Sequence, residues 1–223
     1  AVNTLRKEGY MECESTSFCD NNLTASHIFS ITSPKNGPDS NFKSFFDSKP
    51  NTGGKKDDHY LTNLTWGPNE KSIFIAEVNR GQNHMHFNEY SVKGKNKVRT
   101  VFEEKHDKWM EPENPGFFPT YKENIMLWMS EKDGFMNLYK VNMENGSWTA
   151  LTNFKFPITS YMGMTENGAH VFVQATGTDG REKHIYKVEI ATGKTTQVTT
   201  VNGNHNAQFS STGNYILDSY SNT

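Results

Sequence analysis

The sequence has 223 residues, a formal net charge of −2 at pH 7 and an aromatic content of 13%. This near-neutral charge argues against a nucleic-acid-binding protein, because such proteins usually present a net basic surface. No apolar run approaches the roughly 20 residues that a membrane-spanning helix needs, so we expect no membrane span in this chain.

The first 58 residues predict part of a small sheet and a long polar loop. His27–Thr32 has the pattern of a strand, and the segment between Ser33 and His59 is rich in Pro, Gly, Asn, Ser and Lys. Cys13 and Cys19 are the only cysteines. A disulfide between them and a pair of free thiols are both compatible with their spacing.

From residue 59 onward the sequence repeats a Tyr-x-Val triplet. The triplets begin 49 and 47 residues apart, and each is followed within a few residues by a polar turn; they are Tyr90-Ser91-Val92, Tyr139-Lys140-Val141 and Tyr186-Lys187-Val188. A repeat of this length indicates a series of small stacked sheets, because one unit cannot bury its own apolar faces.

Each repeat is predicted to contain four short strands, with the triplet in the third. The first strands are Leu61–Trp66, Pro115–Pro119 and Thr159–Met164. The second strands are nearly continuous apolar runs, as in strands buried on both faces; they are Ser72–Glu77, Ile125–Met129 and His170–Gln174. The fourth strands are Val98–Phe102, Trp148–Thr152 and Thr195–Thr199, and a further unit begins with strands at His205–Ser210 and Tyr215–Asp218.

These strands predict an all-β fold, a β-propeller fragment of about three complete four-stranded blades with partial blades at both ends. The predicted blades cover approximately residues 59–104, 115–156, 158–203 and 205–223, the last one partial. A β-sandwich is the structural alternative, but it does not explain the regular return of the pattern. Because propellers close with 4–8 blades, we expect this chain alone to form an open arc or to pair with another copy.

Few residues suggest chemistry. The sequence has no Gly-x-Ser-x-Gly nucleophile motif, no phosphate-binding loop and no His-Glu-x-x-His, and we expect no cofactor. His84 and His86 would lie on one face of a strand, a spacing that can chelate a metal. No third ligand can be identified from the sequence, so we predict no metal site and favour a solvated strand end.

Two further segments are candidate sites. The adjacent Glu103 and Glu104 would point to opposite faces of a strand, and the charged residues that follow favour a surface loop over an amine-binding pocket. Residues 108–118 combine aromatic residues with two prolines in a linker between two units, so Trp109 and Glu111 are candidate substrate-binding residues. Packing between blades is the alternative role of this linker.

Several segments resemble the propeller of the dipeptidyl peptidase IV family. His59-Tyr60-Leu61-Thr62-Asn63-Leu64-Thr65-Trp66 is similar to the family's DHYL…TW segment, and Arg80-Gly81-Gln82-Asn83 is similar to its R-x-Q-N. Ser130-Glu131-Lys132-Asp133-Gly134-Phe135 resembles a turn of the same propeller, and Ala1-Val2-Asn3 resembles its AVNP segment. The resemblance covers most of residues 59–223, while residues 4–58 match poorly.

This resemblance implies the propeller of a serine exopeptidase that releases Xaa-Pro or Xaa-Ala dipeptides. The Ser-Asp-His triad of such enzymes lies in an α/β-hydrolase domain that this chain lacks, so no catalytic residue is expected here and the chain alone is expected to be inactive. The glutamate pair that binds the substrate amine lies upstream of the AVNP segment, and Glu103 and Glu104 do not match it. Around Trp109, only the Trp and a Pro-aromatic ending match the family loop near the substrate pocket.

The implied role of the chain is to gate and wall the substrate cavity. The implied partners are the hydrolase domain, a peptide substrate and a second copy in a homodimer, and the implied location is the periplasm, the cell surface or the medium. The alternative is a non-catalytic propeller that binds protein or glycan partners.

Overall fold

The computed structural model describes residues 59–68, 70–94, 96–119, 124–210 and 212–222. Within these ranges all 13 regular elements are β-strands, and every pairing between them is antiparallel. No helix in the described part of the chain has the length and apolar character needed to cross a membrane. The predictions for residues 1–58, including the strand at His27–Thr32 and the pairing of Cys13 with Cys19, fall outside the described residues.

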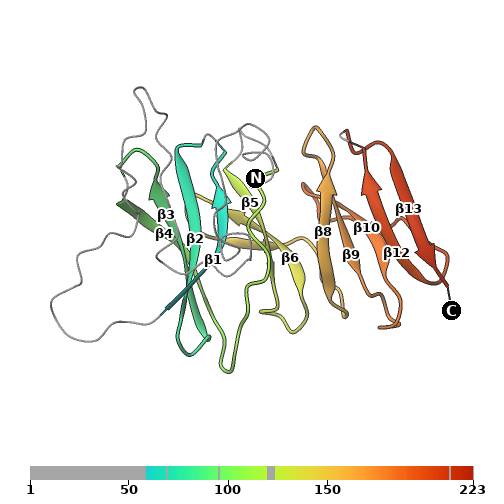
Figure 1. Ribbon diagram of the computed structural model, residues 1–223, viewed down its shortest axis with the longest axis horizontal. Coiled ribbons are helices and arrows are strands. Elements are labelled where there is room, and N and C mark those ends of the chain that lie inside the picture. The colour runs from blue at the N-terminus through green and yellow to red at the C-terminus, as the bar shows by residue number, and fades with distance from the viewer. Residues whose placement is uncertain (1–58, 69, 95, 120–123, 211, 223) are drawn as a thin grey trace, which may run out of the picture. The chain divides into compact units, whose positions relative to one another are not determined.

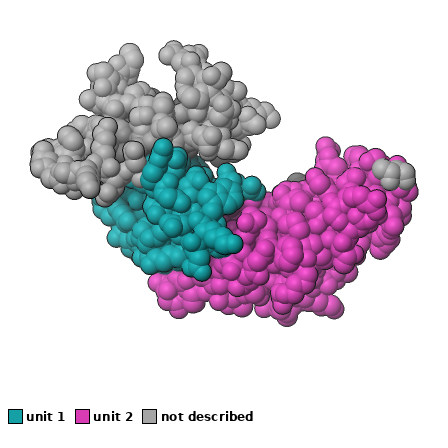
Figure 2. All heavy atoms as spheres, turned by 90° about the horizontal axis from the view of Figure 1, so that it is seen from below, with its two compact units in different colours: residues 1–113 teal, residues 114–223 magenta. Residues whose placement is uncertain are grey.

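The chain forms two compact units, residues 1–113 and 114–223, which are coloured separately in Figure 2. The described part of the first unit contains one four-stranded sheet in the order β1-β2-β3-β4. Its strands are β1 (His59–Trp66), β2 (Ser72–Asn79), β3 (His84–Ser91) and β4 (Asn96–Lys105). The sheet is a simple meander because short turns join successive strands (Figure 1).

Strand β2 is buried on both faces, as its apolar run predicts. On one face, Ile73 and Ile75 pack with Leu61 and Tyr90. On the other face, Phe74 stacks on Phe87 with ring centroids 5.7 Å apart, and Phe87 stacks on Phe102 of β4 at 5.0 Å. These packed rings fix the positions of β3 and β4 relative to each other.

The second unit contains three successive sheets. The first has β5 (Ile125–Ser130), β6 (Asn137–Asn142) and β7 (Trp148–Ala150). The second has β8 (Ile158–Met164), β9 (His170–Ala175), β10 (His184–Glu189) and β11 (Thr195–Gln197), and the third has β12 (Asn204–Phe209) and β13 (Ile216–Ser221). In chain order these sheets follow one another through the unit (Figure 1).

Face-to-face packing joins the three sheets of the second unit. Buried Leu127 and Leu138 of the first sheet share one apolar core with Val171 and Val188 of the second. The second sheet contacts the third through a smaller cluster in which Phe172 and Ile185 meet Ala207. Each sheet thus buries a face against the next one, which is the packing that the repeat predicted.

The predicted first strand at Pro115–Pro119 is wrong. Within this segment the structure shows an isolated bridge, in which Phe117 and Leu127 are joined by two backbone hydrogen bonds of 3.0 and 2.7 Å, and the sheet that follows has three strands among the described residues. Pro115 and Pro119 have no amide hydrogen, so neither residue can donate to a strand ladder. The predicted strands elsewhere in the described residues are present, and the fold class, an all-β propeller fragment, is confirmed.

A buried polar residue also repeats in the sheets, two residues before each tyrosine of the triplets. The polar residue is 0%, 3% and 6% exposed in the three sheets, and a threonine further along the chain contacts its side chain. The threonine Oγ1 lies 2.8, 2.7 and 3.4 Å from it; the pairs are Thr100–Asn88, Thr152–Asn137 and Thr199–His184. The repeat therefore extends to a specific side-chain contact in each sheet.

Candidate functional site

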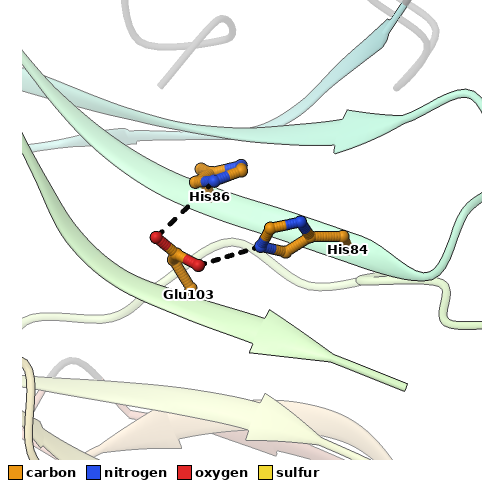
Figure 3. A group of neighbouring side chains, drawn as sticks. All are labelled: His84, His86 and Glu103. Atoms are coloured by element: carbon orange, nitrogen blue, oxygen red, sulfur yellow. Dashed lines mark hydrogen bonds and ion pairs between the residues drawn. The ribbon is translucent and has the colours of Figure 1, made fainter. Parts of the chain in front are cut away.

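Two imidazoles and a carboxylate meet on one face of the first unit's sheet. His84 and His86 lie two residues apart on β3, and Glu103 is directly opposite His86 on β4. The Nε2 atom of His84 lies 2.9 Å from Glu103 Oε2, and the Nε2 atom of His86 lies 3.6 Å from Glu103 Oε1. Figure 3 shows both rings turned toward this single carboxylate. We call these three residues the His-His-Glu cluster.

The sheet itself positions the cluster. Met85 and Phe87, which alternate with the two histidines along β3, are fully buried, so both histidines must lie on the opposite face. Their side chains are 28% and 37% exposed, and that of Glu103 is 47% exposed. The packed face therefore fixes the backbone, while the three functional groups remain accessible to solvent.

The prediction of a surface loop at Glu103 and Glu104 is wrong, because β4 continues through Lys105. Pairing continues to the end of the strand, where Met85 faces Glu104 and His84 faces Lys105. Glu104 is consequently on the other face of the sheet from Glu103, in agreement with the predicted alternation. Glu103, for which the sequence indicates no role, supplies the third group beside the histidine pair.

Local electrostatics favour the charged carboxylate of Glu103 and the neutral ring of His86. The hydrogen bond from His84 is the main reason that the pKa of Glu103 is lowered, and the neighbouring His86 and Lys105 act in the same direction. Burial lowers the pKa of His86, and the nearby His84 lowers it further. Lys105 Nζ also lies 3.6 Å from Glu103 Oε2, so the carboxylate already attracts cationic groups.

The linker that contains the candidate residues Trp109 and Glu111 leaves the sheet at the same end as the cluster. The indole Nε1 of Trp109 donates to Gln82 Oε1 at 2.7 Å, and the backbone amide of Met110 donates to the Gln82 carbonyl at 2.7 Å. His106 Nδ1 accepts from the Trp109 amide at 3.0 Å. Trp109 is 50% exposed and Glu111 is also exposed. The indole is thus anchored through Nε1 and remains half-exposed to solvent.

A second pair of titratable residues lies in the second unit, where the buried His205 contacts the partly exposed Asp218. His205 Nε2 lies 2.7 Å from the carbonyl oxygen of Val201, and His205 Nδ1 lies 2.6 Å from Asp218 Oδ2. A carbonyl oxygen and a carboxylate both accept hydrogen bonds, so this arrangement suits the protonated imidazole, in which both ring nitrogens donate. Burial would lower the pKa of His205, but these hydrogen bonds outweigh it and the pKa is raised.

The neighbouring His184 contacts a hydroxyl and a carboxylate, as the base of a catalytic triad would. Its Nδ1 lies 3.4 Å from Thr199 Oγ1, and its Nε2 lies 3.1 Å from Glu182. However, Thr199 is buried, and its Oγ1 accepts the backbone amide of Ile185 at 2.9 Å. The first sheet of this unit repeats that bond between Thr152 and the amide of Leu138, also at 2.9 Å. The contact is therefore structural.

Comparison with known proteins gives a family match over most of the chain. Residues 29–223 match the family model described as the dipeptidyl peptidase IV (DPP IV) N-terminal region. Among solved structures, a putative dipeptidyl aminopeptidase IV from Bacteroides ovatus is 26% identical with a TM-score of 0.69, over 77% of this chain and 27% of that chain.

Another similar structure is the dipeptidyl peptidase 4 of Porphyromonas gingivalis. It is 20% identical with a TM-score of 0.65, over 75% of this chain and 23% of that chain. At that identity the similarity concerns the fold alone. This chain spans about a quarter of the length of either solved protein.

Proposed function

The chain belongs to the family of the dipeptidyl peptidase IV N-terminal region, and from that premise we propose that it gates and walls the substrate cavity of a dipeptidyl peptidase IV-like serine exopeptidase. The proposed reaction releases Xaa-Pro or Xaa-Ala dipeptides from peptide N-termini. The observation that carries the proposal is the family match over residues 29–223, which agrees with successive sheets of the propeller type.

In this proposal the chain contributes positioning and access rather than bond cleavage. A ring of blades admits an extended peptide and excludes a folded protein, and its inner wall holds the peptide against the nucleophile. Such positioning lowers the barrier because the scissile bond is presented in a reactive geometry. The Trp109 loop suits a wall, since the indole is anchored through Nε1 to Gln82 and keeps an exposed face for a substrate side chain.

The proposed partners are an α/β-hydrolase domain of the same protein, a peptide substrate and a second copy of the protein. The hydrolase domain would supply the catalytic serine, aspartate and histidine, because chemistry beside a repeat scaffold needs residues from elsewhere in the protein. We also propose a location in the periplasm, at the cell surface or in the medium. Fractionation of the source cells tests the location, and recovery in the cytoplasm alone would reject it.

The activity is tested with the full-length protein and a Gly-Pro chromogenic substrate. We expect turnover by the full-length protein and none by the 223-residue chain alone. Absence of turnover by a folded full-length protein would reject the peptidase proposal and leave the alternative, a propeller that binds protein or glycan partners.

The wall role is tested by Trp109→Ala in the full-length protein. Loss of the anchored indole is expected to lower kcat/KM for a longer Xaa-Pro peptide by about tenfold, or about 1.4 kcal/mol of transition-state stabilisation. Trp66→Ala is the matched control, because Trp66 is 45% exposed in the same unit and its loss is expected to leave kcat/KM unchanged. A Trp109→Ala variant that is less stable but equally active would assign the loop to packing alone.

A further inference from the structure

The His-His-Glu cluster has the ligand types of a transition-metal site. Zinc is bound in proteins by imidazole nitrogens and carboxylate oxygens at about 2.0–2.2 Å, and sites with three protein ligands leave a position open for water or an external ligand. Imidazole and carboxylate together suit zinc better than magnesium or calcium, which take oxygen ligands almost exclusively.

The distances in the cluster also suit one shared ion. Ligand atoms about 2.1 Å from a tetrahedral ion are about 3.4 Å from each other. The observed separations of 2.9 Å and 3.6 Å between the histidine Nε2 atoms and Glu103 bracket that value, and the three ligand atoms lie within 4.8 Å of one another. Small rotations of solvent-exposed side chains are enough to bring all three onto one ion (Figure 3).

The sheet prepares this arrangement before any ion binds. The buried Met85 and Phe87 hold β3 in place, and the pairing of His86 with Glu103 fixes the carboxylate across from the rings. Both imidazoles already direct Nε2 toward the same carboxylate, with ring centroids 4.2 Å apart. A salt bridge needs only one of these rings, whereas a metal ion uses both together with the carboxylate.

We propose that His84, His86 and Glu103 bind a zinc ion at the exposed end of the β3–β4 pair. The ion replaces Lys105 as the cation nearest to Glu103 and links the two strands beside the point where the Trp109 loop leaves the sheet. Because the side chains are partly exposed, the remaining coordination positions are open to water or to an external ligand. This proposal is independent of the peptidase activity.

The test is titration of the metal-free 223-residue chain with zinc chloride in a calorimeter. Cys13→Ser and Cys19→Ser are introduced into every protein tested, because cysteines are zinc ligands in their own right. We expect one zinc ion per chain and at least about tenfold weaker binding in His86→Gln and in Glu103→Gln, since even loss of an outer contact costs about 10–100-fold. His170→Gln, which changes a histidine on β9, is expected to bind zinc like the parent.

Two further measurements separate loss of the site from loss of the fold. Thermal unfolding in a chelator must be the same for parent and variants, which shows that weaker binding is not a failure to fold. Cobalt(II) added in place of zinc is expected to give intense visible bands in the parent and in His170→Gln, but not in His86→Gln. The proposal is overturned if the parent binds no zinc, or if His86→Gln and Glu103→Gln bind it as tightly as the parent does.

Discussion

The repeated threonine contact allows a quantitative prediction for Thr152→Val. Thr152 is 5% exposed; its Oγ1 accepts the amide of Leu138 at 2.9 Å and donates to Asn137 Oδ1 at 2.7 Å. Valine has nearly the same shape but no hydroxyl group, so the substitution leaves the Leu138 amide without this acceptor. A buried unsatisfied donor costs about 1–3 kcal/mol, and the second hydrogen bond contributes about 1 kcal/mol.

The free energy of unfolding is therefore expected to fall by about 3 kcal/mol in Thr152→Val. For a chain of this length that corresponds to a decrease in Tm of about 6–12 °C. Thr152→Ser is the matched control, because it keeps the hydroxyl and loses one methyl group, at a cost of about 1 kcal/mol. Thermal and urea unfolding followed by circular dichroism measure both variants. Equal stability of the valine and serine variants would refute the structural role of the hydroxyl.

Three other predictions concern a buried charge, an anchored loop and a turn. Because folding raises the pKa of His205, the protonated ring stabilises the fold fully below about pH 6.5. This stabilisation is lost as the pH rises through the pKa of His205 in the folded state. Urea unfolding should show this loss in the parent but not in Asp218→Asn, whose amide can donate to a neutral ring. Gln82→Leu removes the acceptor of the Trp109 indole and should speed amide hydrogen exchange at 106–113. Gly193→Ala should cost at least about 1 kcal/mol in urea unfolding, because φ is 75° and a Cβ would lie 3.0 Å from the Leu151 carbonyl oxygen.

Each of these predictions can be contradicted directly. Equal pH dependence of Asp218→Asn and the parent would show that the ion pair does not set the pH response. Unchanged exchange at 106–113 in Gln82→Leu would mean that other contacts hold the loop. Gly180→Ala is the control for the turn, because a Cβ at this position would have no atom within 4 Å. This substitution should change the free energy of unfolding by no more than about 0.5 kcal/mol. An equal loss of unfolding free energy in Gly193→Ala and Gly180→Ala would show that the backbone conformation of Gly193 does not cause the loss.

The strands were predictable because their signal is local. The run around Ile73 and Ile75 indicated a strand buried on both faces, and the Tyr186-Lys187-Val188 triplet marked the third strand of its repeat. Both signals depend only on the period of the side chains along the chain. The strand predicted at Pro115–Pro119 failed for an equally local reason, since its prolines lack the amide hydrogen that a ladder requires.

The cluster was only partly predictable. The spacing of His84 and His86 shows that they share a face, but Glu103 is 17 residues beyond His86, and only the register of β3 on β4 brings it opposite. The sequence does not determine that register, because the pairing of β3 with β4 contains two irregularities. A carboxylate directly after the predicted fourth strand, Val98–Phe102, was the available signal.

The buried polar pairs were missed because apolar patterning treats polar residues as surface positions. Asn137 and His184 occupy the same place relative to the tyrosine of their repeats, 47 residues apart, and Thr152 and Thr199 are separated by the same distance. Alignment of the repeats on the Tyr-x-Val triplets would have shown the coincidence. The contact itself follows only from the pairing of strands, because a buried polar group requires a partner.

The most direct test of the account is an experimental structure of the full-length protein by electron cryomicroscopy. We predict that Asn88, Asn137 and His184 occupy the same position in three successive blades of a propeller, beside a separate catalytic domain. Placement of these three residues in non-equivalent strands, or closure of the sheets into a two-layer sandwich, would contradict the account.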